Sequence, residues 1–516
     1  MTRARVVASS RHPSFVVLAG VLIAVFTVIR APFLWYFPRV FMSQDSASYM
    51  DVAREIRDGL WPQFVIRTPA YPIFLWAVNS FGDRWLAVVF VQMLLSLAAC
   101  LLVVWCVREI RPGLAWPATI AMCGMLGSAQ VLFYEISILS DSMYASSLAV
   151  AAALLILAFV RKSPAPLALA SAAMAFAILV RPAGSFLAVI FAIVVAGLAW
   201  NRAGWRNIAA FAVPFPSILL ALCTYNAATI SRFTVNPFGE ANLTGATALF
   251  WEKDPSLPPA VNRALDGLPA SYAELGITAG DLATVRKSWD VDRLFRIYAD
   301  SYNKLIWSDG WGSGTRFGPG GYIANQRAIR AVCFSAIGRH PALYLKFVWV
   351  NLVSFFEGVG YRFDIYSSLR FRARGPLGTR PAGIDLASAA HAAVRPVAES
   401  IPSNRDLDHP VVRVQQAWEE VHGFIFQRSA WAAACLIIFA ASAAQLIRHR
   451  GRHEGAFLLF ALTLFPIGAS LVVCLVEVAS DRYSFPTQFV YYLAAALSPI
   501  LAAPRLGRAR KPAEGR

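Results

Sequence analysis

Long apolar runs separated by short polar loops fill most of the chain, and this pattern predicts a protein that crosses a membrane many times. About 20 apolar residues in a helix cover the hydrocarbon core of a bilayer. Runs of about this size lie at 15–37, 85–107, 114–133, 141–160, 165–180, 184–200, 208–225, 430–447, 456–476 and 484–504, and a shorter one lies at 341–356. We therefore predict an all-α polytopic membrane protein with about 10–11 transmembrane helices.

The basic residues of the short loops orient these helices. Lys and Arg are enriched in short loops that face the cytoplasm. Here they follow alternate apolar runs: Arg108 and Arg111, Arg161 and Lys162, Arg202 and Arg206, and Arg448, Arg450 and Arg452. Placing these loops inside puts both termini in the cytoplasm and puts 38–84, 134–140, 226–340 and 357–429 outside. The number of crossings is then even, so we expect 341–356 to be an interfacial or re-entrant helix.

The same pattern divides the chain into four regions. Residues 1–225 form a transmembrane core that includes the first outer loop, 38–84. Residues 226–340 are rich in Pro, Gly, Asn and Asp, which predicts a small outer cap with short helices near 279–306 and 324–338. Residues 341–429 combine the interfacial or re-entrant helix with a second outer segment, in which an Ala-rich helix is expected near 385–399. Residues 430–516 hold the last transmembrane helices and a cytoplasmic tail.

Composition supports the membrane assignment and changes the meaning of the charge. The chain is 57% hydrophobic and only 15% charged, with a mean hydropathy of +0.53, which excludes an ordinary soluble enzyme or a disordered chain. The net charge of +17 would suggest nucleic acid in a soluble protein. Here much of it lies in membrane loops, so no nucleic-acid partner is expected. Arginine dominates the basic residues, which fits either a GC-rich genome or phosphate recognition by guanidinium groups.

The first outer loop carries the most informative residues. Asp45 lies shortly after the first apolar run and begins an amphipathic helix that ends at Gly59, and Arg67-Thr68-Pro69-Ala70-Tyr71-Pro72 leads back to the membrane. Asp is a common helix N-cap. A carboxylate at a membrane surface can also take a proton from an acceptor hydroxyl. The residues alone leave both roles open for Asp45.

The order of these features resembles the GT-C class of membrane glycosyltransferases, in particular the protein O-mannosyltransferase and lipid A aminoarabinose transferase types. Further motifs agree with it: Asp141 at the start of the fourth helix, Arg181-Pro182 between the fifth and sixth, Arg482-Tyr483 at the last helix, and His340-Pro341 after the cap. All of these motifs fall on the predicted outer face. Many members carry Asp-Glu in the first loop where this chain has Asp45-Ser46, so the resemblance supports one carboxylate there.

The resemblance implies a mechanism and a set of roles. The donor would be a polyprenyl-phosphate-linked sugar, transferred with inversion to a cell-envelope glycan, lipid or protein at the outer face of the cell inner or plasma membrane. Asp45 would be the catalytic base. The donor phosphate would be held by Arg67, Tyr71, Arg181, Arg482 and Tyr483, and the acceptor or a metal by Asp141, Glu477 and His340. Arginine or a divalent cation such as Mg²⁺ or Mn²⁺ can stabilise the leaving phosphate, so no cofactor is certain.

Simpler structural roles exist for several of these residues. Arg181 could reach toward the interface while its stem stays in the membrane. Asp141 could cap the fourth helix. Arg482 could pair with Asp481 or Glu477, His340 could be structural, and the tyrosines could belong to an interfacial aromatic belt.

Two other classes of membrane protein stay open. A glycan polymerase or ligase would depend on a late outer loop with paired arginines and a histidine, for which Arg362, Arg370 and His391 are available. A solute transporter or lipid flippase would show inverted repeats and charges in the middle of helices. Because the helix interiors of this chain are nearly uncharged, the sequence favours the transferase.

Overall fold

The computed structural model describes residues 13–36, 40, 44–79, 85–303, 305, 311–312, 314–318, 321–357, 417–418, 421–476 and 481–502. Every regular element in these ranges is a helix. The Ala-rich helix expected near 385–399, most of the second outer segment, and Glu477 lie outside the described residues. The same holds for Arg362, Arg370 and His391, on which the polymerase or ligase alternative depends.

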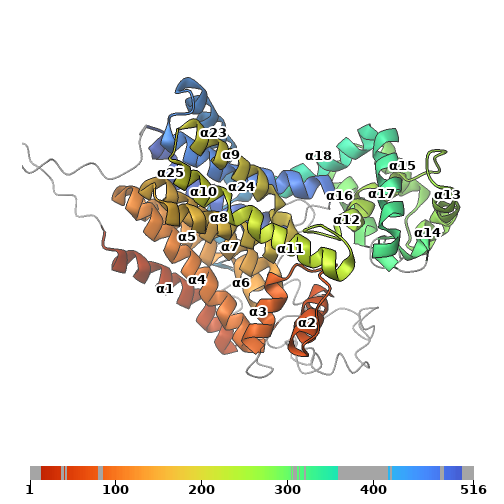
Figure 1. Cartoon of the computed structure of the whole chain (residues 1–516), viewed down its shortest axis with the longest axis horizontal. Coiled ribbons are helices and arrows are strands. Elements are labelled where there is room, and N and C mark those ends of the chain that lie inside the picture. The colour runs from red at the N-terminus through yellow and green to blue at the C-terminus, as the bar shows by residue number, and fades with distance from the viewer. Residues whose placement is uncertain are drawn as a thin grey trace, which may run out of the picture.

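A bundle of long apolar helices makes up the larger part of the molecule (Figure 1). In the part of the chain that the structure describes, eight candidate membrane spans are long and apolar enough to cross a bilayer. They are α1 (Phe15–Tyr36), α4 (Trp85–Ile110), α7 (Ser140–Arg161), η2 with α9 (Pro182–Phe186 and Leu187–Trp200), α10 with α11 (Trp205–Ala212 and Pro214–Ile230), α23 (Arg428–Arg448), α24 (Glu454–Val476), and α25 with η7 (Asp481–Leu497 and Ser498–Ala502). The prediction of an all-α, multi-pass membrane protein is confirmed.

Two shorter apolar helices accompany these spans. α8 (Pro164–Val180) packs along α7 inside the bundle, and α18 (Pro341–Glu357) packs against both α24 and the cap. The centre of the bundle is α7, most of whose side chains are buried. Its small residues, such as Ala149, Ala152 and Ser146, allow close approach of neighbouring helices, which is how membrane helices pack without a hydrophobic driving force between them.

The predicted run at 114–133 is not one straight helix. After η1 (Pro112–Leu114), α5 (Ala115–Gly127) and α6 (Ala129–Ile136) meet at Ser128 with a bend of 55°. Carbonyl groups released at such a break need donors, because the hydrocarbon core of a membrane supplies no water. Three side chains supply these donors: Arg30 Nη1 donates to Leu126 O (2.8 Å), Trp418 Nε1 to Gly127 O (2.9 Å), and His422 Nε2 to Gly124 O (2.7 Å).

A fully buried ion pair stands beside this break. Arg30 on α1 donates through Nε and Nη2 to both carboxylate oxygens of Glu135 on α6, at 2.8 and 2.9 Å. The side chains are 1% and 0% exposed. A paired, bidentate geometry is the arrangement that makes buried charges tolerable. The pair therefore fixes α6 against α1, close to the point where the chain turns into α7.

The cap lies at one end of the bundle (Figure 1). It consists of α12 (Gly239–Thr247), η3 (Ala248–Phe250), α13 (Pro259–Leu265), α14 (Leu268–Glu274), α15 (Ala279–Lys287), α16 (Val291–Asn303), η5 (Thr315–Phe317) and α17 (Gly321–Arg339). It has its own core, in which Phe250, Phe295 and Trp311 are buried. Two further helices of the first outer loop, α2 (Gln44–Arg57) and α3 (Ala70–Asn79), lie toward the same end of the bundle.

Candidate active site

The first feature of the site is an ion pair between Asp45 and Arg67. Asp45 lies in the first turn of α2, and Arg67 lies in the loop that leads into α3. Arg67 Nη2 is 2.5 Å from Asp45 Oδ1, and Arg67 Nε donates to Ser48 Oγ at 2.7 Å. The guanidinium lies over the ring of Tyr49, 4.4 Å from its centre. The Asp45 side chain remains 25% exposed, so a substrate can reach this carboxylate.

A second, buried ion pair joins Asp141 and Arg181. Asp141 lies in the first turn of α7, and Arg181 directly follows α8. Arg181 Nη1 contacts Asp141 Oδ1. The carboxylate is fully buried, the arginine nearly so, and the guanidinium lies 4.7 Å from the ring centre of Tyr483. The N-cap residue of α7, Leu139, makes no side-chain cap hydrogen bond, and Arg181 turns inward to the Asp141 carboxylate. The alternative in which Arg181 reaches toward the interface is therefore not what the structure shows.

Two hydrogen bonds connect the ion pairs. The Tyr49 hydroxyl, whose ring lies against Arg67, bonds to Ser140 Oγ at 2.8 Å, and Ser140 directly precedes Asp141. Thr68, next to Arg67, donates through Oγ1 to Val180 O at 3.0 Å, and Val180 directly precedes Arg181. The loop before α3 is thus tied to the ends of α7 and α8. Residues far apart in the sequence form one cluster of two carboxylates and two guanidiniums.

Gln92 on α4 stabilises this cluster through hydrogen bonds to residues around it. Its Oε1 accepts a hydrogen bond from the Tyr71 hydroxyl (2.9 Å), and its Nε2 donates to Glu135 O (2.7 Å) and Ser137 O (3.0 Å). Burial, and then the neighbouring Tyr49 and Asp141, hold the pKa of Tyr71 well above its ordinary value of 10.0. Tyr71 is therefore a neutral donor to Gln92, fully buried, with its ring edge-on to Tyr49 at 4.9 Å. It belongs to the floor of the site.

The other predicted site residues are less well placed or lie outside the description. His340 lies in the cap, where Nε2 is 2.8 Å from Glu252 Oε1 and the ring is edge-on to Phe250. His340 thus bonds to a residue of the cap, and its predicted role with Asp141 and Glu477 stays a prediction. Arg482 lies in the first turn of α25, but its side chain is outside the described atoms, as is all of Glu477.

Sequence reasoning missed Gln92, Arg30 and Glu135. Arg30 and Gln92 are polar residues within otherwise apolar runs, and Glu135 is the second residue after one. A polar or charged side chain at membrane depth is costly unless it is paired or hydrogen-bonded. That rule could have marked all three as members of a buried network. It could not have identified their partners, because Arg30 and Glu135 are 105 positions apart.

The donor set does not favour a metal site. Among the described residues, no group of three or more His, Cys, Asp or Glu side chains is arranged to hold an ion. Asp45 and Asp141 each face an arginine, which already balances their charge. We derive no step through a cation.

No family model matches the chain, and no curated protein matches it. Among solved structures, the crystal structure of the Archaeoglobus fulgidus oligosaccharyltransferase in its apo form is similar over 94% of this chain and 50% of that chain, at 15% sequence identity and a TM-score of 0.36. The chain therefore spans about half the length of that protein.

Proposed function

We propose that this protein is a membrane glycosyltransferase that moves a sugar from a polyprenyl-phosphate donor to a hydroxyl-bearing acceptor outside the cytoplasm, with inversion at the anomeric carbon. The proposal combines the resemblance of the loop motifs to GT-C enzymes with the cluster of Asp45, Arg67, Asp141 and Arg181. The loops at the opposite ends of the spans carry the arginines that mark a cytoplasmic face. This charge distribution supports an outer location for the cluster.

One observation carries the assignment of the base: the two carboxylates differ in access. Asp45 is 25% exposed, whereas Asp141 is 0% exposed behind Arg181. A general base must come within hydrogen-bond reach of the proton that it removes, and only the Asp45 carboxylate is open to an acceptor. A nearby positive charge also favours the ionised carboxylate, which is the form that accepts a proton. Asp141 instead holds Arg181 in place.

The step balances without a cofactor. Asp45 takes the proton of the acceptor hydroxyl while the oxygen of that hydroxyl attacks the anomeric carbon of the sugar. The bond between that carbon and the phosphate oxygen breaks, and the electron pair stays on the polyprenyl phosphate. The leaving group is a stable anion, so it needs positive charge more than a proton. A guanidinium has five N–H donors, which allows Arg67 to hold Asp45 and a phosphate oxygen together.

The test uses the full-length protein in nanodiscs with a panel of polyprenyl-phosphate sugars and an envelope extract as acceptor. Release of polyprenyl phosphate is followed by mass spectrometry. The variant Asp45→Asn should fold normally and release the lipid about 10²–10⁴ times more slowly, the usual contribution of a general base. The matched control is Asp51→Asn, because Asp51 lies on the same helix, pairs with Arg54 at 3.0 Å and is 53% exposed. That control should keep the parent rate.

Each outcome bears on the proposal. Release from one donor, lost in Asp45→Asn and kept in Asp51→Asn, supports the reaction and identifies the sugar. Release that survives Asp45→Asn overturns Asp45 as the base and moves the test to Asp141→Asn. No release from any donor by the folded parent protein overturns the transferase proposal itself.

A further inference from the structure

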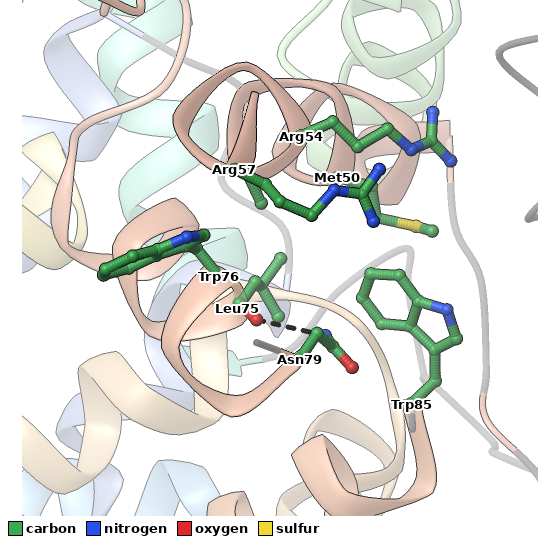
Figure 2. Close-up of a pocket in the computed structure, with 8 residues that line it drawn as sticks. Met50, Arg54, Arg57, Leu75, Trp76, Asn79 and Trp85 are labelled. Carbon is green, nitrogen blue, oxygen red and sulfur yellow. Dashed lines mark hydrogen bonds between the residues drawn. The ribbon is translucent and has the colours of Figure 1, made fainter. Parts of the chain in front are cut away.

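A shallow, open hollow lies between α2, α3 and the start of α4, and Asp45 is not among the residues that line it. Figure 2 shows its lining. Arg54 and Arg57 extend from α2 on one side, and Leu75 and Trp76 of α3 and Trp85 of α4 lie on the other. Met50 also lines it. The hollow thus pairs two guanidiniums with an apolar and aromatic floor.

The position of Trp85 places this hollow at the surface of the membrane. Trp85 is the first residue of α4, and the first charged residue after it on that helix is Arg108. The 26 residues of α4 span about 39 Å at about 1.5 Å per residue, more than the roughly 30 Å of a hydrocarbon core. The helix therefore begins among the lipid headgroups, where tryptophan is enriched.

The neighbouring surface is suited to lipid tails. Leu86, Phe90 and Leu94 are exposed at intervals of four residues along α4, so they form one outward stripe that begins beside Trp85. On α3, Ile73 and Trp76 are 43% and 39% exposed. A molecule whose headgroup enters the hollow can lay its acyl chains along these apolar side chains.

We propose that this hollow binds the phosphodiester headgroup of an anionic phospholipid of the surrounding bilayer. Arg54 and Arg57 contact the phosphate, Trp76 and Trp85 surround the glycerol region, and the acyl chains follow the exposed side of α4. The arginines also pair with Asp51 and Asp58, at 3.0 and 3.5 Å. A guanidinium with five donors can hold a carboxylate and a phosphate at once.

The site is separate from the reaction proposed above and does not depend on it. Asp45 and Arg57 are 12 positions apart on α2, about 18 Å along the helix axis. Arg57 is also turned by roughly 120° from Asp45 around the helix, at 3.6 residues per turn. One phosphate cannot contact both groups. The bound phospholipid instead anchors α2, the helix that carries Asp45, to the membrane surface.

The test measures lipid selection by the full-length protein. It is reconstituted in nanodiscs with an equal mixture of phosphatidylglycerol and phosphatidylcholine, released gently, and analysed for retained lipid by native mass spectrometry. The parent protein should retain phosphatidylglycerol in preference to phosphatidylcholine. The double variant Arg54→Gln/Arg57→Gln should retain about tenfold less, since hydrogen bonds to charged groups are being removed. If the double variant does not fold, Arg57→Gln alone is used instead. This side chain is 51% exposed, so its replacement should leave the fold intact.

A matched control is available at the opposite end of the bundle. Arg206 also lies by a tryptophan, 5.8 Å from the ring of Trp205, but both side chains are exposed there. Arg206→Gln should leave phosphatidylglycerol retention unchanged. Equal retention by the parent and the Arg57 variants would overturn the proposal. Equal retention of the two phospholipids would also overturn it, because it would indicate an apolar groove alone. Displacement of phosphatidylglycerol by an equal amount of polyprenyl phosphate would overturn it too, because it would assign the hollow to the lipid carrier.

Discussion

Tyr49 and Ser140 share a hydrogen bond of 2.8 Å that joins the two carboxylate–arginine pairs of the candidate site. The ring of Tyr49 lies against Arg67, and Ser140 is the residue before Asp141. The bond crosses from the first outer loop to the start of α7. It sets how far apart the accessible carboxylate and the buried one can be, and so how the reaction centre is shaped.

Removing the Tyr49 hydroxyl should slow the reaction without unfolding the protein. In Tyr49→Phe the ring stays beneath Arg67, and one hydrogen bond worth about 1 kcal/mol is lost. We expect kcat for polyprenyl phosphate release to fall about fivefold while the thermal midpoint changes little. Ser140→Ala should have the same effect, and the double variant should lose no more than either single variant. A double variant that loses the sum of both effects would show that the two hydroxyls act independently.

Substitutions of Arg67 should separate the contribution of its charge to activity from the contribution of its guanidinium geometry. Arg67 holds Asp45 and Ser48 through different nitrogens, which a lysine ammonium cannot reproduce in the same fixed geometry. We expect Arg67→Lys to keep part of the activity and Arg67→Ala to lose more, with an increased KM for the donor. Steady-state kinetics with varied donor check this.

A double-mutant cycle tests whether the effect of Arg67 on activity depends on its ion pair with Asp45. Because Asp45 and Arg67 are in contact, the losses in Asp45→Asn and Arg67→Ala should not add in the double variant. Additive losses would mean that Arg67 serves the donor without any help from Asp45.

Much of this architecture could be predicted from the sequence. Where the structure describes them, the ten long apolar runs are helical, one of them with a break, and the motifs around Asp45, Arg67, Asp141 and Arg181 do meet at one end of the bundle. Periodicity and loop chemistry are local properties, and they were sufficient for these elements. The pairing was not predictable: which carboxylate faces which arginine depends on how α7 and α8 pack against the first outer loop.

The break between α5 and α6 shows why the rest was missed. Residues 114–133 form an apolar run whose Gly127-Ser128 pair is a common place for a kink, but the pair alone does not show that the helix breaks there. The break is stabilised by Arg30, Trp418 and His422, which approach from far along the chain. Gly124 also allows the ring of Phe426 to pack closely beside this break, because a Cβ at that position would collide with the ring. A local pattern cannot reveal a bend that is made by distant donors.

The stability of the cap should fall at acid pH through Asp254. Hydrogen bonds from Ser335 and from Ser256, whose backbone N–H is 2.8 Å from Oδ1, lower the pKa of Asp254 from its ordinary 3.8 to about 2. A carboxyl whose folded pKa is depressed contributes stability that is present above the unfolded pKa and is lost as the pH falls through the folded one. We therefore expect the cap to lose stability between about pH 4 and pH 2.

Tryptophan fluorescence can follow this transition, since Trp251 and Trp311 are buried in the cap. Asp254→Asn should be less stable at neutral pH and should show a weaker dependence of stability on pH in that window. An unchanged pH profile in Asp254→Asn would assign the acid transition to other carboxylates.

Neutralising one member of the Arg30–Glu135 pair should be among the most destabilising single changes in the bundle. Glu135→Gln leaves the Arg30 charge buried without its counter-ion, which costs about 3–5 kcal/mol. Replacing both residues, as in Arg30→Met/Glu135→Leu, removes both charges and should recover much of this loss. Recovery should be incomplete, because Arg30 also donates to Leu126 O at the helix break, and a buried carbonyl without a donor costs about 1–3 kcal/mol.

Unfolding by denaturant in mixed micelles measures these differences, and the exposed pair of Lys162 and Glu454, 2.5 Å apart, is the control. Neutralising both members of that surface pair should change the free energy of unfolding by at most about 1 kcal/mol. If the Arg30→Met/Glu135→Leu variant is as stable as the parent, the Arg30 contact with Leu126 adds nothing, and Trp418 and His422 alone hold the break. A deficit that remains in the double variant would instead show that Arg30 has two roles: it pairs with the Glu135 charge, and it stabilises the bend that directs the chain toward Asp141.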